Sequence, residues 1–312
     1  MSRPSGRRRG LLPLAVAVAA TAGVTAWLVA YLRHGGGPVA PGLAGAPVAM
    51  LAAAAACQRI GSMVRVPRPV RGFWRRLSHA AVCLTLGAAV ALAFAGQHRG
   101  TPYVVAPVLL GVVMGTLGFV HLPLGRRSAL HGLQSLLDGA VVAVAGALIF
   151  GYVVFGMARP GVSTATEVGA AVAGVGGMLA VVVIGKASTV PAGPVDPVAL
   201  RLLAVAPMTG VVAAVLLIAG GGTGRLVLDV LAMPVVATAV CAAAYRQLGV
   251  LDRPATGPAG RRPRSLFNLL PLLAVTATAG LVISVSAERM SWHQRSVIIG
   301  AVLIAACVVL RQ

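Results

Sequence analysis

Three polar side chains, His131, Gln134 and Asp138, are the first candidates for chemistry in this chain. They lie near the start of an apolar stretch, Arg126–Met157, that is long enough to cross a bilayer as a helix. Their spacing of three and then four residues places all three side chains on one face of that helix. Because a carboxylate facing lipid is costly, we expect this face to look into the protein.

Asp138 is the acidic residue placed deepest inside a predicted span. A buried carboxylate needs a partner or a proton, and Lys186 and Arg201, near the ends of neighbouring predicted spans, are the candidate charge partners. Two interpretations stay open. Asp138 is either a functional intramembrane carboxylate or a structural group whose hydrogen bond ties two helices together.

The histidines give a weaker signal. His79, His121 and His131 lie near the same ends of three successive predicted spans, so three imidazoles at one depth are candidates for binding a metal or a haem. Each comes from a different helix, and no ligand motif relates them. We therefore expect histidines that contact headgroups or backbone, and we predict no metal and no cofactor.

The sequence contains none of the usual catalytic motifs. The glycine runs at Gly35 and Gly220 follow the ends of apolar stretches, and no Lys with Ser or Thr follows them as a phosphate-binding loop requires. HExxH, GxSxG and a paired acidic cluster for magnesium are also missing. We predict that the chain is not an enzyme. Glycines at helical spacing instead indicate close helix packing, namely Gly111, Gly115, Gly118, Gly174 and Gly177.

The composition of the chain indicates a membrane protein, in which helices must position the polar residues described above. The chain has 312 residues, 58% hydrophobic and 10% charged, with a mean hydropathy of +0.91, which is too apolar for a soluble domain of this size. The net charge of +20 comes from short clusters between apolar runs, so we expect no nucleic-acid partner. The four cysteines show neither a CxxC pair nor a disulfide pattern.

Ten apolar stretches predict an all-α, polytopic helix bundle in the plasma membrane. We place the spans at Leu11–Leu32, Pro38–Cys57, Leu77–Ala95, Tyr103–Leu124, Ala129–Phe155, Val168–Ile184, Val198–Ala219, Leu226–Tyr245, Leu266–Val285 and Val297–Leu310.

Basic residues orient this bundle, because Lys and Arg collect in cytoplasmic loops. With the amino terminus inside, 20 of the 26 basic residues fall on the cytoplasmic side and 6 on the other. We therefore predict both termini in the cytoplasm and a single transmembrane domain over residues 1–312, with a basic leader at 1–10. The Arg-rich cytoplasmic loops at 58–76 and 246–265 are expected to contact the anionic headgroups of the lipid bilayer.

Three stretches resemble a known family. RPRSLFNLLPLLAVTATAGLVISVSAERMSWHQRSVIIGAVLIAACVVLRQ resembles the last two spans of the ten-helix membrane module of actinobacterial GGDEF and EAL proteins, which turn over cyclic-di-GMP. RRSALHGLQSLLDGAVVAVA is similar to the basic pair and LLDG-like helix of that module, and FWRRLSHAAVCLTLGAAVALA is similar to its third helix.

This resemblance implies an integral membrane sensory or anchoring module. Neither a GG(D/E)EF nor an EAL signature occurs in these residues, so no catalytic residue carries over and no catalytic activity is expected. The implied partner is a second copy or a cytoplasmic signalling protein near the carboxyl terminus. Two alternatives stay open: a drug/metabolite-type transporter, which is also built from ten helices, and a membrane scaffold without a ligand.

Overall fold

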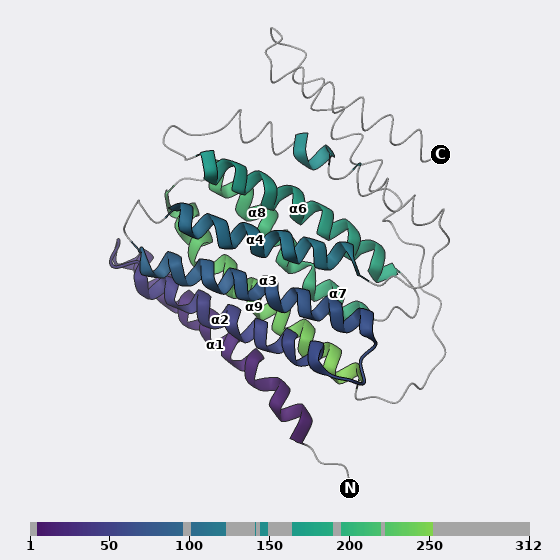
Figure 1. The fold of residues 1–312 in the computed structure, drawn as a ribbon. Coiled ribbons are helices and arrows are strands. Elements are labelled where there is room, and N and C mark those ends of the chain that lie inside the picture. The colour runs from purple at the N-terminus through teal and green to yellow at the C-terminus, as the bar shows by residue number, and fades with distance from the viewer. Residues whose placement is uncertain are drawn as a thin grey trace.

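The computed structural model describes residues 5–95, 101–122, 141, 144–148, 164–189, 195–219 and 222–251. Within these ranges all regular structure is helical, and the long helices lie side by side in one bundle (Figure 1). The helices are α1 (Ser5–Arg33), α2 (Ala40–Ser62), α3 (Arg68–Ala93), α4 (Thr101–Val120), α6 (Thr164–Thr189), α7 (Pro197–Leu203), α8 (Val205–Ala219) and α9 (Gly222–Leu251).

Seven stretches of this described part are long and apolar enough to cross a membrane. They coincide with seven of the ten predicted spans, which confirms the helical membrane bundle. The predicted span Ala129–Phe155 is described only at Val141 and residues 144–148, which are helical. The last two predicted spans lie outside the described residues.

The first Arg-rich loop is shorter than predicted, which corrects the sequence analysis. α2 continues to Ser62 and α3 begins at Arg68, so the predicted loop at 58–76 shrinks to residues 63–67. The physical reason is that arginine is a good helix former, and a proline in the first turn, here Pro69, costs no hydrogen bond. The arginines of this region therefore lie on helices.

The second predicted loop, 246–265, needs the same correction at its start. α9 extends to Leu251, so residues 246–251 form its last turns. Tyr245 was the predicted end because apolar character stops there, although the helical backbone continues through polar residues.

One predicted span contains a local irregularity at Ala204, although the backbone angles there, φ −63° and ψ −23°, remain helical. The stretch predicted as Val198–Ala219 forms α7 and α8, with Ala204 between them. Pro207 has no backbone N–H for the carbonyl of Leu203, and its ring disfavours regular helix at that carbonyl. The irregularity therefore falls one turn before the proline.

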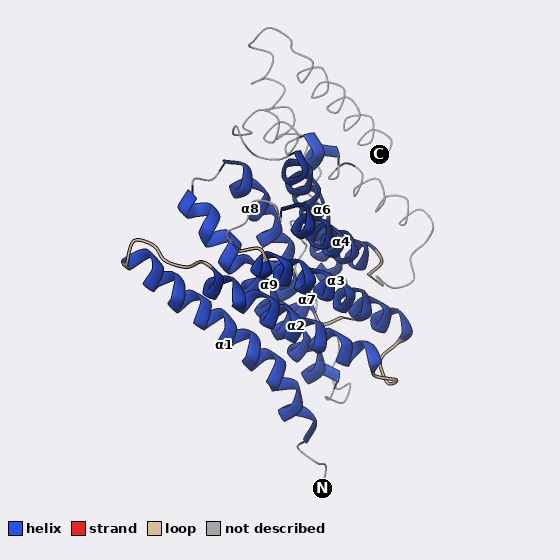
Figure 2. Cartoon of the chain, turned by 60° about the vertical axis from the view of Figure 1, so that its left-hand side comes forward, coloured by secondary structure: helices blue, strands red, loops and turns tan. Residues whose placement is uncertain are grey.

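A tight turn joins α1 and α2 at the end of the bundle that carries Arg33. Gly35, Gly36 and Gly37 have φ angles of 70°, 138° and 152°, a backbone region that side chains with a Cβ rarely adopt. The GGG run is therefore a turn, and it folds α1 and α2 into an antiparallel pair at the edge of the described bundle (Figure 2).

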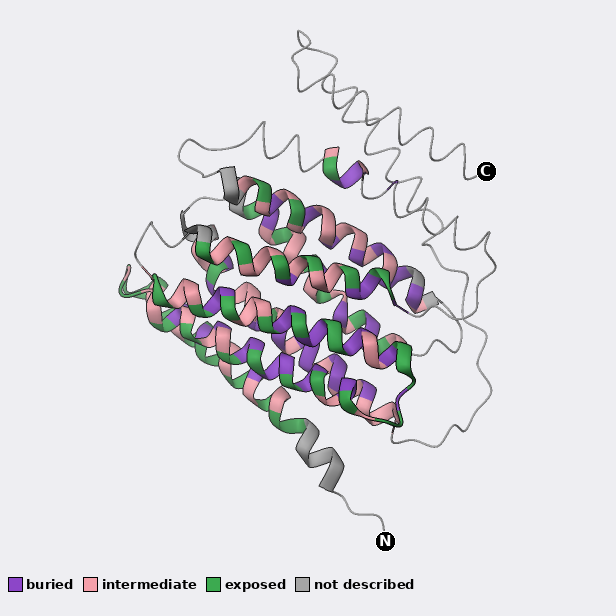
Figure 3. Cartoon of the chain, viewed as in Figure 1, coloured by how far each residue is buried: buried purple, intermediate pink, exposed green. Residues whose placement is uncertain are grey.

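Each helix packs against its neighbours so that the described helices close into a ring. α2 packs against α1, α3 and α9; α4 packs against α3 and α6; α8 packs against α6 and α9. Small side chains permit this crowding around α2, whose buried residues include Ala49, Ala53 and Ala56. Outward faces are exposed (Figure 3) and carry large apolar side chains, among them Leu12, Leu51, Leu86 and Leu110, as a lipid-facing surface requires.

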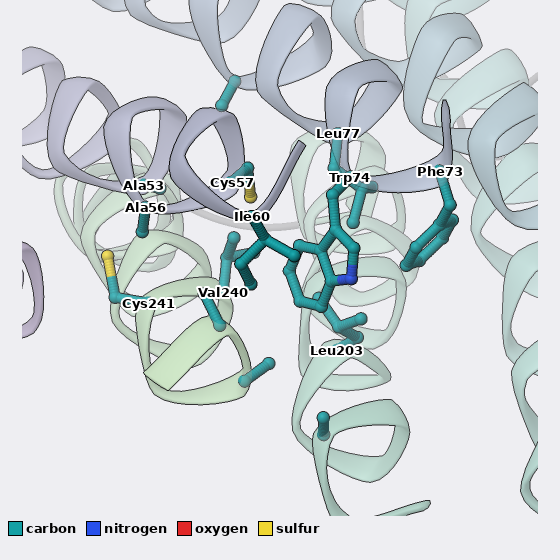
Figure 4. Close-up of a cluster of buried hydrophobic side chains, with 14 of the residues drawn as sticks. Ala53, Ala56, Cys57, Ile60, Phe73, Trp74, Leu77, Leu203, Val240 and Cys241 are labelled. Atoms are coloured by element: carbon teal, nitrogen blue, oxygen red, sulfur yellow. The ribbon is translucent and has the colours of Figure 1, made fainter. Parts of the chain in front are cut away.

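The core is concentrated where α2, α3, α7 and α9 meet. Trp74 is fully buried there, beside Ile60, Leu203 and Val240 (Figure 4). Phe73 makes edge contacts with Trp74 and with Phe119 of α4, at ring-centroid distances of 5.5 and 5.8 Å. These contacts join α4 to the core formed by α2, α3, α7 and α9. This core lies near the end of the bundle that carries the arginines of α2 and α3.

Candidate functional site

The intramembrane face predicted from the sequence falls outside the described residues. His131, Gln134 and Asp138 all belong to the undescribed stretch 123–140, so their common face stays a prediction. Of the predicted charge partners, Lys186 is placed in α6, with its side chain outside those described, and Arg201 is an exposed residue of α7.

His79 and His121 are both exposed, on α3 and at the end of α4. His121 Nδ1 lies 2.8 Å from the carbonyl oxygen of Leu117, one turn back on its own helix. His131 lies outside the described residues. Over the part of the chain that the structure describes, no group of three or more His, Cys, Asp or Glu is placed to hold a metal ion.

Asp196, which is not among the residues predicted from the sequence, is the centre of a polar cluster. Asp196 is the N-cap of α7, and its Oδ2 accepts hydrogen bonds from the backbone N–H groups of Val198 and Ala199 at 3.0 and 3.1 Å. An N-cap carboxylate satisfies N–H groups that the helix itself leaves without partners, and it interacts favourably with the helix dipole. Pro197, at the first helical position, is preset for the same turn.

Two residues in the last turns of α9 also form hydrogen bonds with Asp196. Arg246 Nε donates to Asp196 Oδ2 at 3.3 Å, and the backbone N–H of Asp196 donates to Gln247 Oε1 at 2.9 Å. Gln247 is only 2% exposed, and the side chains of Arg246 and Asp196 are 41% and 11% exposed. We call these three residues, Asp196, Arg246 and Gln247, the α7–α9 junction.

Part of this junction carries a local sequence signal. An aspartate followed by a proline and an apolar run is typical of a helix start, and the predicted span begins two residues later, at Val198. Arg246 and Gln247 were assigned to a loop. Their helical position in α9 is what places them opposite Asp196.

Positive charge predominates at the end of the bundle where the α7–α9 junction and the arginines of α3 lie. The described carboxylates are Glu167, Asp196 and Asp229, and Asp196 is the one that lies at the arginine-rich end. Its pairing with Arg246 leaves the arginines of α3 without an ion pair to any of these carboxylates. A surface of this kind favours anionic partners.

A second polar contact lies midway along the bundle, between α1 and α9. Thr21 Oγ lies 2.9 Å from Thr238 Oγ and 3.1 Å from the carbonyl oxygen of Pro234. The hydroxyl is also 2.8 Å from the carbonyl oxygen of Ala17 on its own helix. This contact crosslinks the first and last described helices.

An open groove of about 660 Å³ runs beside that contact. Its lining is almost wholly apolar and comes from α1 and α9, with residues Val18, Thr21, Ala22, Thr25, Ala26, Val29 and Thr238. A second shallow hollow of about 440 Å³ lies over Arg201, Ala204, Val205, Met208, Thr209 and Val212, next to the irregularity between α7 and α8. Neither hollow gathers acid, base and nucleophile groups of the kind that catalysis needs.

No protein-family model, no curated protein and no solved structure matches this chain. The class therefore follows from the fold. Seven apolar helices in the described part, a lipid-compatible outer surface and arginines gathered at one end define a multi-pass helical membrane protein.

Proposed function

We propose that the chain is an integral membrane sensory or anchoring module that relays the state of its helix bundle to a cytoplasmic signalling partner. The resemblance of three stretches to the membrane module of GGDEF and EAL proteins supports this function. The partner, either a second copy or a cyclic-di-GMP signalling protein, is expected near the carboxyl terminus. We place the bundle in the plasma membrane and expect no catalysis by residues 1–312.

The observation that carries the proposal is the α7–α9 junction. Two hydrogen bonds, from Arg246 Nε to Asp196 Oδ2 and from the backbone N–H of Asp196 to Gln247 Oε1, join the start of α7 to the last turns of α9. Two further bonds to Asp196 Oδ2 cap α7 itself. A displacement of α6 or α8 would therefore be passed to the end of α9, since packed helices shift between discrete arrangements and deform little. The relay needs this rigid link between distant segments of the chain.

The direct test joins the carboxyl terminus to a soluble GGDEF domain of known activity and measures cyclic-di-GMP in membranes that contain the fusion. Asp196→Ala and Arg246→Gln should each change the output relative to the parent fusion, because they loosen the junction. Asp229→Asn, at an exposed position of α9 away from the junction, is the matched control. Equal output from all four fusions would refute the relay.

A transporter is the second candidate, and one observation favours it. The span Pro197–Leu216 carries Pro207 and a local irregularity at Ala204, and spans interrupted by proline are common at the binding sites of transporters. Counterflow of candidate solutes into proteoliposomes that contain the purified chain separates the two. Specific, saturable flux would favour the transporter, and cyclic-di-GMP synthesis or hydrolysis by the same preparation would contradict both candidates.

A further inference from the structure

The first turns of α3 carry a continuous basic face. Arg68, Arg71 and Arg75 recur at a spacing of three and four residues, which puts them on one side of the helix, and Arg76 extends that side toward α4. The opposite side is the buried one, with Val70, Phe73, Trp74 and Leu77 in the core. We call Arg68, Arg71, Arg75 and Arg76 the arginine face of α3.

α3 is long enough to bring this face to the level of the lipid headgroups. α3 has 26 residues and is about 39 Å long at 1.5 Å per residue, whereas the hydrocarbon core of a bilayer is about 30 Å thick. The excess of roughly 9 Å corresponds to about two turns, which fits the stretch that begins at Arg68. Arg75 and Arg76, slightly deeper, reach the headgroups because long basic side chains extend toward the interface.

Arg75 is held in place by α2. Its Nε donates to the carbonyl oxygen of Gly61 at 2.9 Å, which leaves the two terminal nitrogens of the guanidinium as further donors. Arg68, Arg75 and Arg76 are exposed and Arg71 is half-buried. None of the four forms an ion pair with a described carboxylate, so the arrangement supplies several N–H donors and an uncompensated positive charge.

We infer that the arginine face of α3 binds the phosphodiester headgroup of an anionic membrane lipid such as phosphatidylglycerol. Guanidinium groups bind phosphate oxygens in bidentate fashion, and the depth of the face in the membrane selects a lipid over a soluble anion. This inference rests on the bundle spanning a membrane and is independent of the proposed relay. It also moves the expected lipid contact from a loop to a helix with fixed geometry.

The test uses the purified full chain in neutral detergent micelles, titrated with phosphatidylglycerol or phosphatidylcholine, with bound lipid counted by native mass spectrometry. The variant is Arg68→Gln/Arg71→Gln/Arg76→Gln, which spares Arg75 and its bond to Gly61. The matched control is Arg7→Gln/Arg8→Gln/Arg9→Gln, which removes the same charge from the start of α1 at the same end of the bundle. Gel filtration and thermal unfolding check that each variant is folded.

The α3 variant should lose at least about tenfold in affinity for phosphatidylglycerol, since each basic residue near an anionic surface contributes up to about 1 kcal/mol, with phosphatidylcholine binding unchanged. The α1 variant should change either affinity by less than about twofold. An equal loss in both variants would show diffuse attraction by net charge and overturn the inference. Displacement of the lipid by excess inorganic phosphate would do so too, by showing a site for free anions.

If the glutamine variant fails to fold, Arg68→Lys/Arg71→Lys/Arg76→Lys decides the matter, because it keeps the charge and removes the bidentate geometry. A loss of selectivity for phosphatidylglycerol would support the inference. Wild-type selectivity in that variant would overturn it.

Discussion

Arg246 Nε lies 3.3 Å from Asp196 Oδ2, which joins the end of α9 to the first turn of α7. The same oxygen accepts the backbone N–H groups of Val198 and Ala199. One carboxylate oxygen is thus shared by three donors, and the most distant of them is 50 residues away in the chain. The start of one helix and the end of another are therefore set by a single side chain.

Asp196→Ala should lower the free energy of unfolding by about 1–2 kcal/mol, because it removes the cap of α7. Asp196→Asn should lower it less, since the amide oxygen can still accept the two backbone N–H groups. The Arg246 pair is partly exposed, so its loss should lower the free energy of unfolding by less than the loss of the cap does. Denaturant unfolding of the purified chain in detergent measures both, and equal losses in the two variants would show that charge, rather than capping, is what stabilises the junction.

Gly177→Ala should destabilise the contact between α6 and α8. A Cβ at this position would lie 2.8 Å from the carbonyl oxygen of Pro207 and 2.8 Å from Cγ2 of Val211, so α6 and α8 would have to separate. Gly210→Ala is the matched control, because no atom lies within 4 Å of the added carbon and alanine favours helix by about 1 kcal/mol. The thermal unfolding temperature should fall for Gly177→Ala and rise for Gly210→Ala. A rise for both variants would contradict the close approach of α6 and α8.

Thr238→Val should weaken the contact between α1 and α9, because it removes the hydroxyl 2.9 Å from Thr21 Oγ. Hydrogen bonds between membrane helices contribute about 0.6 kcal/mol on average, so a small loss of unfolding free energy is expected. Thr25→Val is the control, since the Thr25 hydroxyl bonds within its own helix, to the carbonyl oxygen of Thr21. The prediction fails if both variants unfold alike.

Asp138→Leu should reduce the folded yield in detergent if His131, Gln134 and Asp138 face the bundle interior as their spacing predicts. The replacement would remove one partner of a buried polar contact. Asp229→Leu should have little effect, because Asp229 is exposed on α9. Matching yields for the two variants would argue against a buried role for Asp138.

The orientation can be tested with reporter fusions. The charge distribution predicts ten spans with both termini in the cytoplasm. Fusions after Gly35, Gln97, Pro160, Gly222 and Arg289 should all report the outer side of the membrane. A cytoplasmic signal from any of the three middle fusions would disprove this topology.

Hydropathy predicted the existence of the described helices because lipid selects for long apolar runs, and the runs at Pro38–Cys57 and Leu226–Tyr245 were located correctly. Helix ends were predicted less well. Arginines at the start of α3 and the end of α9 look like a loop by polarity, yet their backbone is helical. A pattern of apolar residues reports the part of a helix inside the membrane and misses the turns beyond it.

The α7–α9 junction includes contacts that local sequence patterns could not predict. The cap at Asp196 is readable from the following proline, whereas its bond to Gln247 joins residues 51 positions apart. That contact depends on how α6, α7 and α9 pack, and a buried glutamine near a helix end resembles a solvated one in sequence. The predicted face around Asp138, by contrast, came from spacing alone and lies outside the described residues.

The burial of Trp74 has an optical consequence. Its indole is 0% exposed, and its Nε1 has no hydrogen-bond partner among the described atoms, so the ring is held in dry surroundings between four helices. Indole emission shifts to longer wavelength when water reaches the ring. Because Trp74 directly precedes Arg75 of the arginine face, its fluorescence should report hydration near that face without any attached dye, once the other two tryptophans, Trp27 and Trp292, are replaced by phenylalanine.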